Sequence, residues 1–460
     1  MKGKHVHFVG IGGIGMSSLA HIMLKKGYQV TGCDINSDQE TVSSLKAAGC
    51  VIETPHGSAC CFDDSIDMMV YSTDTRHPMP EKDRALRGGA ALKHRAELLA
   101  DIMSQKQSIA ISGAHGKTST TAMIGHLLQV AHADPTVVVG GICPQWKTNF
   151  MYGKSNIMIA EADESDRSFL KLPAQTKIVT NIDHEHLETY SSLQDRQATF
   201  LQFLNSNNQN NSTHVICVDD PSIQQIRHLI DINYVTYAID NKADFYAKNI
   251  DLQPLSSSFD LYVYGQCVAR CTLAVPGKHM LLNALGALAA ARMFSSVSYE
   301  YLVDGLKSFC PVERRFTIRG SFHHATVIDD YAHHPQEIAV TIQTACNFAK
   351  GRTFVFFQPH RFTRTAGLWD QFVQTFRREL ANAKLHFFMT TIYSAGEPEM
   401  SDVSTERMVK EIDNGRCAFI ENRTESIIKA LPNDLSEDDT ILFMGAGNVS
   451  KHSTEIFAYQ

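Results

Sequence analysis

The residues of this sequence most able to do chemistry follow a glycine-rich turn and are Lys117 and Thr118. The stretch IAISGAHGKTSTTAMIGHLL, residues 109–128, has an apolar β-type run before the turn and a helix-type run after it. A strand, a glycine turn, a lysine and a hydroxyl residue at a helix start are typical of a P-loop, which cradles phosphates and helps to hold Mg²⁺. That motif is usually written G-x-x-x-x-G-K-[ST], whereas only two residues separate Gly113 from Gly116 here. The turn is therefore either a phosphate loop of unusual length or a plain connection between a strand and a helix.

Carboxylates and histidines follow the next two β-type runs. The stretch IAEADESDRSF carries four carboxylates, Glu161, Asp163, Glu164 and Asp166. The stretch NIDHEHLETY carries two histidines, His184 and His186. Carboxylates at a strand end beside a phosphate loop are placed to bind Mg²⁺ directly or through water, and nearby histidines strengthen a metal or substrate role. An acidic surface loop with structural histidines is the alternative interpretation.

Two further polar stretches lie in the last third of the chain. The stretch DDYAHHP ends a β-type run with Asp329, Asp330, Tyr331, His333 and His334. The stretch FQPHRFTRT carries Arg361 and Arg364, three residues apart. Paired arginines can clamp a carboxylate or a phosphate through two hydrogen bonds each. Each stretch alone also fits a solvated loop, but both lie at strand ends, where open α/β sheets bind ligands.

A second glycine-rich loop, GIGGIG, occupies residues 10–15 at the end of the first β-type run. Glycines let the backbone approach a pyrophosphate, and the N–H groups of the following helix attract anions. Asp34 stands about 20 residues on, where dinucleotide-binding folds place a partner for a ribose hydroxyl. The loop therefore fits a dehydrogenase, another nucleotide-binding protein, or a tight turn without a ligand.

Alternating strand and helix patterns position these residues and predict three tandem α/β domains. Residues 1–103 fit a Rossmann-like domain, residues 104–312 a P-loop-like domain, and residues 313–460 a second Rossmann-like domain. Between about residues 244 and 275 the pattern changes to alternating strands, which predicts a small antiparallel region.

Composition excludes several classes of function. The chain has 460 residues and a net charge of −7, with no lysine- or arginine-rich block, which argues against a nucleic-acid partner. No apolar run approaches the roughly 18 residues of a membrane span, and the glycine-punctuated N-terminus fits a strand better than a signal peptide. The eleven cysteines show no C-x-x-C spacing and fit scattered free thiols in the cytoplasm.

Eight stretches, in order along the chain, together resemble the Mur ligases of peptidoglycan synthesis. They are GIGGIGMS, GAHGKTST, EADESDRSF, NIDHEHLETY, GKHMLLNAL, ERRF, DDYAHHP and FQPHRFTRT. That family writes its phosphate loop in the short form, which favours a phosphate cradle and removes the dehydrogenase interpretation of the first loop. The resemblance implies a UDP-sugar domain, a central ATPase domain and an amino-acid domain. It also implies an enzyme that uses ATP and Mg²⁺ to join L-alanine to UDP-N-acetylmuramate through an acyl phosphate.

The resemblance also implies roles for individual residues. Those facing the UDP-sugar are Ile11, Gly12, Gly13, Ile14, Gly15, Met16 and Ser17. Those around the ATP phosphates are Gly113, Ala114, His115, Gly116, Lys117, Thr118 and Ser119. Asn283 is implied near the adenine, and the ATP site is completed by Arg315, Asp330 and Tyr331. The implied Mg²⁺ ligands are Thr118, Glu161 and His186, the implied L-alanine contacts are His333, Arg361 and Arg364, and the implied catalytic residues are Lys117, His186 and His333.

Four positions depart from the family pattern. Ala114 replaces a threonine, and Glu185 replaces an aspartate beside a histidine. Met280 replaces an asparagine, which puts one adenine contact in doubt. Gln197 stands where related ligases keep a lysine that can be carbamylated to help a second metal ion, so how a second Mg²⁺ would be held is open.

Two rival functions remain. A murein tripeptide ligase of peptidoglycan recycling uses the same sugar nucleotide, but its first loop resembles GICGTFM rather than GIGGIGM. A non-catalytic nucleotide-binding or regulatory protein on the same scaffold is the other rival. Met280 and Gln197 favour it, whereas six retained residues argue against it: Lys117, Thr118, Glu161, His186, Arg361 and Arg364. The sequence sets neither the oligomeric state, monomer or weak dimer, nor the preference among alanine, glycine and serine.

Overall fold

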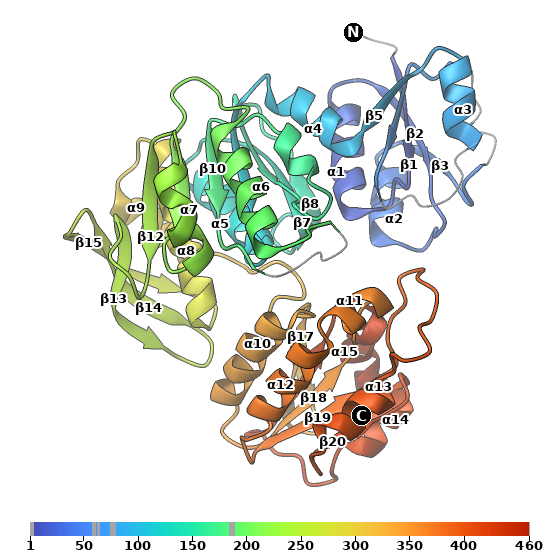
Figure 1. Cartoon of the computed structure of the whole chain (residues 1–460), viewed down its shortest axis with the longest axis vertical. Coiled ribbons are helices and arrows are strands. Elements are labelled where there is room, and N and C mark those ends of the chain that lie inside the picture. The colour runs from blue at the N-terminus through green and yellow to red at the C-terminus, as the bar shows by residue number, and fades with distance from the viewer. Residues whose placement is uncertain (1–3, 58–60, 62–64, 74–79, 184–188, 460) are drawn as a thin grey trace. The chain divides into compact units, whose positions relative to one another are not determined.

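The computed structural model describes residues 4–57, 61, 65–73, 80–183 and 189–459 (Figure 1). The chain divides into two compact units. The first comprises Met1–Asn249, Phe259–Thr272 and Leu282–Cys310, and the second comprises Ile250–Ser258, Leu273–Leu281 and Pro311–Gln460. Each unit is described by itself.

The N-terminal part of the first unit is a parallel sheet in the order β3-β2-β1-β4-β5. Its strands are β1 (His5–Val9), β2 (Gln29–Cys33), β3 (Val51–Glu53), β4 (Met68–Tyr71) and β5 (Ala91–His94). The connecting helices are α1 (Ile14–Lys25), α2 (Glu40–Ala47), α3 (Pro80–Arg87) and α4 (Arg95–Met103). The chain runs outward from β1 to β3 and returns to β4 on the other side of β1. The loop after β1 therefore lies at a reversal of strand order, where such sheets bind ligands.

The rest of the first unit is built on a mixed sheet in the order β15-β14-β13-β12-β11-β10-β6-β9-β7-β8. Its strands are β6 (Gln107–Ser112), β7 (Thr136–Cys143), β8 (Thr148–Met151), β9 (Ile157–Glu161), β10 (Thr176–Val179), β11 (His214–Cys217), β12 (Tyr234–Ala238), β13 (Phe245–Leu252), β14 (Ser257–Val263) and β15 (Gln266–Leu273). Its helices are α5 (Lys117–Val130), α6 (Leu193–Asn205), α7 (Pro221–Ile226), α8 (Lys278–Met293) and α9 (Tyr299–Leu306), with short 3₁₀ turns at Ser168–Lys171 and Arg227–Leu229. Strands β9, β6 and β10 are adjacent and parallel, so the loops after them meet at one edge of the sheet.

The predicted antiparallel region is present at the far edge of this sheet (Figure 1). The neighbouring strands β14 and β15 are joined by Tyr264 and Gly265 alone, and both residues have positive φ, 48° and 85°. Only antiparallel neighbours can be joined by a two-residue turn, and two positive φ angles match the type I′ turn of hairpins.

The second unit contains a sheet in the order β16-β17-β21-β18-β19-β20, parallel except for β16 against β17. Its strands are β16 (Thr317–Phe322), β17 (Ala325–Asp330), β18 (Thr353–Phe357), β19 (Leu385–Met389), β20 (Cys417–Phe419) and β21 (Thr440–Met444). Its helices are α10 (Pro335–Phe348), α11 (Phe362–Gly367), α12 (Trp369–Glu379), α13 (Thr405–Ile412), α14 (Thr424–Ala430) and α15 (His452–Glu455), flanked by 3₁₀ turns at Asn448–Lys451 and Ile456–Tyr459.

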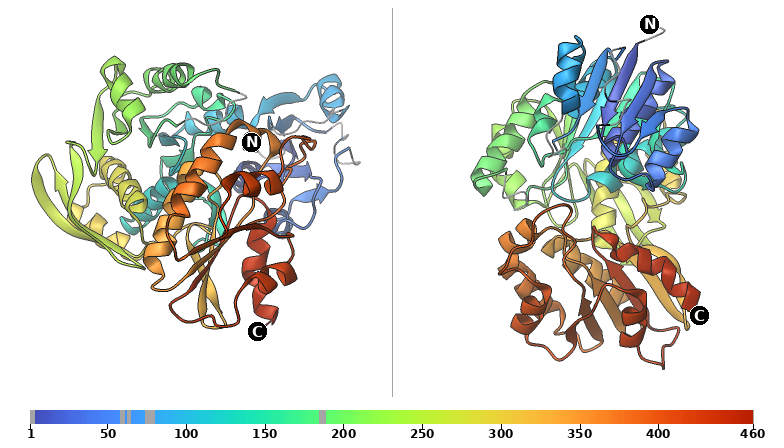
Figure 2. Two further views of the ribbon diagram at one scale, coloured as in Figure 1. Left: turned by 60° about the horizontal axis from the view of Figure 1, so that its bottom comes forward. Right: turned by 90° about the vertical axis from the view of Figure 1, so that its right-hand side faces the viewer.

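Helices cover both faces of this sheet (Figure 2), which explains the continuous apolar run TFVFF of β18. Val355 and Phe357 lie in the core beneath α10, α12 and α13. Phe354 and Phe356 lie in a second core beneath α14. The prediction of three α/β folds in series is confirmed, while the boundaries after residues 103 and 312 stay a prediction. Among the described residues, no helix is both long enough and apolar enough to cross a bilayer.

We expect Phe357→Ala to lower the free energy of unfolding of the second unit by about 3–5 kcal/mol, because it leaves a cavity in a packed core. The Phe357 ring is fully buried, with its centroid 5.5 Å from that of Phe376 and 6.1 Å from that of Phe372. Urea denaturation measures the change. Phe348→Ala is the control, since Phe348 packs on the same core but is only partly buried. Equal losses for the two variants would contradict this account of the core.

Candidate active site

The loop predicted to bind phosphate connects β6 to α5 and is shaped by two glycines. Gly113 has a φ of 137°, and Gly116, which caps α5, has a φ of 82°. A Cβ atom on Gly113 would lie 2.1 Å from the Thr180 hydroxyl, so no larger residue fits there. The N–H groups of the first turn of α5 have no carbonyl partners within the helix, and they favour an anion at this point.

The segment after β10 holds this loop in place through hydrogen bonds to His115. The Asn181 amide accepts the N–H of His115 at 2.9 Å and donates to its carbonyl, also at 2.9 Å. The Thr180 hydroxyl donates to the same carbonyl at 2.6 Å. The His115 ring lies 3.0 Å from an Asp183 carboxylate oxygen. The loop is therefore fixed by three polar residues that follow the neighbouring strand β10.

Lys117 is turned back over its own loop. Its Nζ atom donates to the carbonyls of Gly113 at 2.5 Å and Ala114 at 3.1 Å, and to Glu164 Oε1 at 2.8 Å. The Glu164 side chain is only 3% exposed, while that of Lys117 is 18% exposed. The amino group thus joins the phosphate loop to the acidic loop after β9, and the lysine side chain stays partly exposed.

Oxygen donors for a divalent cation lie on both sides of the loop. Thr118 and Ser119 lie in the first turn of α5, and both are buried. Glu161 ends the neighbouring strand β9 and accepts the N–H of Gly140 at 3.0 Å. Hydroxyl and carboxylate oxygens suit Mg²⁺. The predicted ligand His186 lies outside the described residues, as do His184 and Glu185.

The acidic loop also reaches the N-terminal sheet. Asp163 pairs with the Arg95 guanidinium at 2.5 Å, and Asp166 accepts the Thr73 hydroxyl at 2.5 Å. Burial acts to raise the pKa of the Asp163 carboxyl, but the charges of Arg95 and Lys117 outweigh it and hold the pKa well below its usual range. No motif marked Arg95 or Thr73 in the sequence, because their role depends on where two separate sheets meet within the first unit.

Only the middle residues of the N-terminal glycine loop are exposed to solvent. Gly13 and Ile14 are exposed and Gly15 half-buried, and a Cβ atom on Gly15 would lie 3.4 Å from Arg95 Nη1. The side chains of Ile11, Met16 and Ser17 are buried. These three residues can therefore contribute to a ligand site through their backbone or by shaping the loop.

Asp34 braces this glycine loop. One carboxylate oxygen accepts the N–H of Gly12 at 2.8 Å and the other accepts that of Asn36 at 3.1 Å. Asn149 holds the other end of the loop by donating to Ser17 at 3.0 Å and to the Ile14 carbonyl. No sequence motif marked Asn149, which lies on β8.

Two further predicted positions lie in the first unit. Asn283, on α8, is buried against the phosphate loop, where a Cβ atom on Gly116 would lie 2.5 Å from its Oδ1. Gln197, on α6, donates from its amide to Gln225 at 2.7 Å. Asn283 is thus placed beside phosphate-binding backbone, and Gln197 is engaged with α7.

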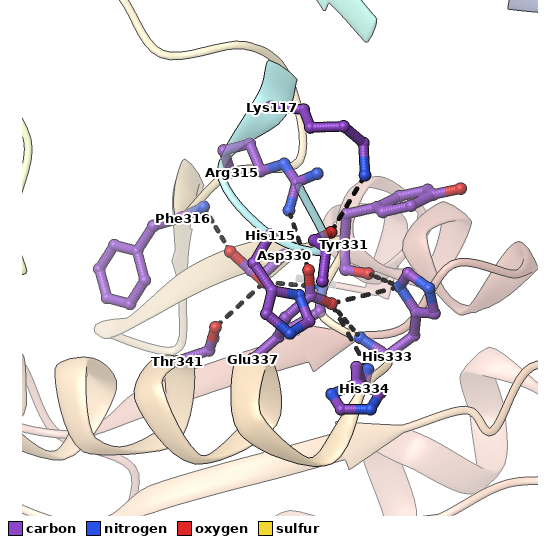
Figure 3. Close-up of polar contacts among 12 residues, drawn as sticks. His115, Lys117, Arg315, Phe316, Asp330, Tyr331, His333, His334, Glu337 and Thr341 are labelled. Carbon is purple, nitrogen blue, oxygen red and sulfur yellow. Dashed lines mark hydrogen bonds and ion pairs between the residues drawn. The ribbon is translucent and has the colours of Figure 1, made fainter. Parts of the chain in front are cut away.

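In the second unit, Asp330 is buried at the end of β17 (Figure 3). Its carboxylate accepts the N–H groups of Phe316 at 2.7 Å and Ala332 at 2.8 Å, and the Thr341 hydroxyl at 3.2 Å. Burial is the largest effect on this group and raises its pKa to about 6. Asp330 therefore ties the linker before β16 to α10.

The residues around Asp330 form a layer of rings and guanidinium groups. Arg314 and Arg315 lie over the Tyr331 ring, 4.8 Å and 5.5 Å from its centroid. Glu337, in the first turn of α10, lies 4.0 Å from Arg315 and 3.5 Å from the His333 ring (Figure 3). The His333 ring also lies 3.0 Å from the Tyr331 carbonyl. The predicted residues Arg315, Tyr331 and His333 are thus neighbours.

The predicted arginine pair follows β18. Arg361 has a left-handed backbone with a φ of 70°, which is uncommon for a long side chain. Its guanidinium pairs with the buried Glu397 at 3.0 Å, and Glu397 also accepts the Thr363 hydroxyl at 2.8 Å. Arg364 lies 3.4 Å from the His360 ring.

His360 connects the arginine pair to His333. The centroids of the two histidine rings lie 6.0 Å apart, and the His360 ring stacks on Tyr393 at 5.4 Å. Burial, followed by the positive charges of His333, Arg364 and Arg361, lowers the pKa of His360 to about 3. The structure therefore gathers positive charge around a neutral ring, and the sequence analysis missed His360, Glu337 and Glu397.

Comparisons with known proteins identify the family of the chain. Three family models match the chain: Mur ligase family, catalytic domain, over residues 5–107; Mur ligase middle domain, over residues 111–291; and Mur ligase, glutamate ligase domain, over residues 314–447.

Several curated relatives, among them the following two, are 38% identical to the chain. The UDP-N-acetylmuramate–L-alanine ligase of Syntrophobacter fumaroxidans matches over 97% of this chain and 94% of its own length. The ligase of the same name from Pelotomaculum thermopropionicum matches over 99% and 97%. The crystal structure of the UDP-N-acetylmuramate–alanine ligase MurC of Thermotoga maritima has a TM-score of 0.81 at 28% identity, covering 99% of this chain and 98% of that one. The chain therefore belongs to the Mur ligase family.

Proposed function

We propose that this protein is a cytoplasmic ligase that joins L-alanine to UDP-N-acetylmuramate with ATP, giving UDP-N-acetylmuramoyl-L-alanine, ADP and phosphate. The observation that carries the proposal is the similarity over nearly the whole chain to relatives named for that activity. The short phosphate loop with Lys117 supports the use of ATP. We assign the UDP-sugar to residues 1–103, ATP to residues 104–312, and the amino acid to residues 313–460.

The reaction needs two transfers. An oxygen of the muramate carboxylate attacks the γ-phosphorus of ATP, and the bond to the ADP oxygen breaks. The alanine nitrogen then attacks the acyl carbon, the bond to phosphate breaks, and the nitrogen loses a proton. Negative charge builds on phosphoryl oxygens in both steps, so fixed positive charge lowers both barriers.

Lys117 is the residue of this chain best placed to supply that charge. Its amino group already bonds two loop carbonyls and Glu164, so a phosphate oxygen can replace the carbonyls while the carboxylate keeps the side chain extended. Bound Mg²⁺ would neutralise part of the negative charge that builds up during the two transfers. Thr118 and Glu161 are the described residues proposed to hold it, because their oxygens suit that ion.

The second unit supplies the proposed amino-acid site. Arg361, Arg364 and His333 surround the neutral His360 with positive charge, which suits the carboxylate of a small amino acid. We assign Asn283, Arg315, Asp330 and Tyr331 to the nucleotide. Their described contacts support this assignment, since Asn283 lies beside the phosphate loop and Asp330 fixes the segment that carries Arg315 and Tyr331.

Phosphate release from ATP tests the function as a whole. The assay contains Mg²⁺ and UDP-N-acetylmuramate, and compares L-alanine with the tripeptide L-Ala-D-Glu-meso-diaminopimelate. We expect release with alanine only. Release with the tripeptide alone would replace the proposal by a recycling ligase, and no release from folded protein would favour a binding role.

We expect Lys117→Ala to reduce turnover by at least about a hundredfold, because it removes a fixed charge from the phosphate site. Steady-state phosphate release measures the loss, and a thermal melt establishes that the variant is folded. The control is Lys307→Ala, which removes a lysine from an exposed pair with Asp304. Near-normal turnover by the folded Lys117 variant would exclude the assigned role.

We expect Arg364→Ala and Arg361→Ala to raise the KM for L-alanine by about ten- to a hundredfold, the effect of losing a charged hydrogen bond. The KM for ATP should change little. Arg361→Ala should also lower the melting temperature, because it removes a partner of the buried Glu397. Arg423→Ala, at an exposed position, is the control. A rise in the KM for ATP with an unchanged KM for alanine would show that the arginine assignment is wrong.

A further inference from the structure

A cluster of metal-ligand side chains lies in the N-terminal sheet, away from the phosphate loop. Its members are His7, Cys33, His56, Cys61 and Glu81. They come from β1, the end of β2, the segment after β3, the stretch before β4, and α3. The proposed ligase reaction uses none of these side chains.

The pleat of the sheet brings the first two members together. His7 pairs in register with Thr31, and Val9 pairs with Cys33. Alternate residues of a strand share a face, so His7 and Val9 on β1 face the same side as Thr31 and Cys33 on β2. Cys33 and Cys61 then lie together in one small core with Val9.

The ligand atoms form two groups that share Cys33. Those of His7, Cys33 and Cys61 lie within 4.8 Å of one another, as do those of Cys33, His56 and Glu81. His56 Nδ1 is 3.1 Å from Cys33 Sγ. Two ligands of a tetrahedral zinc ion, one sulfur and one nitrogen, stand about 3.5 Å apart for ordinary Zn–S and Zn–N bonds. The pair of Cys33 and His56 already has nearly that spacing.

His7 points to a missing ligand independently of this spacing. Its side chain is fully buried, and its Nδ1 atom lies 2.8 Å from the Thr31 hydroxyl. Its Nε2 atom has no nitrogen or oxygen partner within the described part of the chain, and the Cys61 thiol is a polar neighbour of the ring. A buried ring nitrogen without a partner is costly. A histidine fixed through one nitrogen and open at the other is how proteins present imidazole to a metal.

The two sulfur atoms of the cluster are enclosed by the protein. Cys33 is 0% and Cys61 1% exposed, and a hydrogen bond joins their side chains. Thiolate is the form that binds metal ions, so binding would release the protons of both thiols.

We propose that His7, Cys33, Cys61 and His56 bind one zinc ion, with the Glu81 carboxylate beside them as an outer partner. Two sulfur and two imidazole ligands match the preference of zinc and of similar soft divalent ions. Carboxylates that adjoin ligating histidines commonly orient them. A disulfide between the two cysteines is the competing outcome, but it would leave His7 Nε2 without a partner.

The ion would stabilise the start of the glycine loop by fixing Cys33. The Cys33 carbonyl accepts the N–H groups of Gly10 at 2.8 Å and Ile11 at 3.1 Å, so the residue that ligates through sulfur also holds the start of the loop. The ion would link β1 and β2 to His56 and Cys61. Its role is therefore structural, and its test does not depend on the proposed ligase activity.

Metal analysis of the purified full-length protein is the direct test. We expect about one zinc ion per chain by elemental analysis, and replacement by Co²⁺ should give thiolate-to-cobalt charge-transfer bands with the visible bands of a tetrahedral site. Titration against a chelating dye should show at least about tenfold weaker zinc binding for Cys33→Ser and Cys61→Ser. Cys50→Ser, which removes a buried thiol outside the cluster, should bind zinc like the parent protein.

Chelator and thiol measurements complete the test. A strong chelator should lower the melting temperature of the parent and of Cys50→Ser by several degrees, but not that of Cys61→Ser. Parent protein without zinc that also gives no cobalt bands would overturn the proposal, even if the serine variants fail to fold. Equal loss of zinc in Cys50→Ser would overturn it too. An unreduced parent that has lost two free thiols, recovered by reductant, would identify a disulfide instead.

Discussion

The ion pair between Lys117 and Glu164 is the interaction on which the organisation of the phosphate loop depends. Glu164 is almost fully buried, and a buried carboxylate is costly unless a cation and hydrogen bonds compensate it. The same lysine satisfies two carbonyls of a loop that two left-handed glycines make unusually tight. One charge therefore fixes two loops, and the phosphate loop keeps its shape because the acidic loop is beside it.

The acidic loop also bonds to residues that follow the strands of the N-terminal sheet. Its successive carboxylates have different partners: Gly140 for Glu161, Arg95 for Asp163, Lys117 for Glu164 and Thr73 for Asp166. In the sequence these residues look like one block of negative charge. In the structure each carboxylate binds a different partner. Arg95 also lies beside Gly15, so the glycine loop and the phosphate loop are linked through two ion pairs and one short segment.

Much of the fold could be predicted because local patterns decide it. Alternating strands and helices gave three α/β folds, and the uninterrupted run TFVFF matched a strand buried on both faces. The site was predictable only where a motif is contiguous, as at Gly113 to Lys117. Glu397, His360 and Asn149 were missed because their roles come from partners remote in sequence. Asp34 had a motif position, but its two backbone hydrogen bonds, which no spacing rule contains, give it a structural role.

The environment of Gln197 has a consequence for cell physiology. A carbamylated lysine forms reversibly from dissolved CO₂, so an enzyme that depends on one responds to the supply of bicarbonate. Here the side-chain amide donates to Gln225 on the neighbouring helix α7, and an amide nitrogen does not form such a carbamate. At this position the protein has a side-chain hydrogen bond that needs no carbon dioxide to form. Precursor synthesis by such a ligase would be insensitive, at this position, to changes in carbon dioxide in the surroundings of the cell.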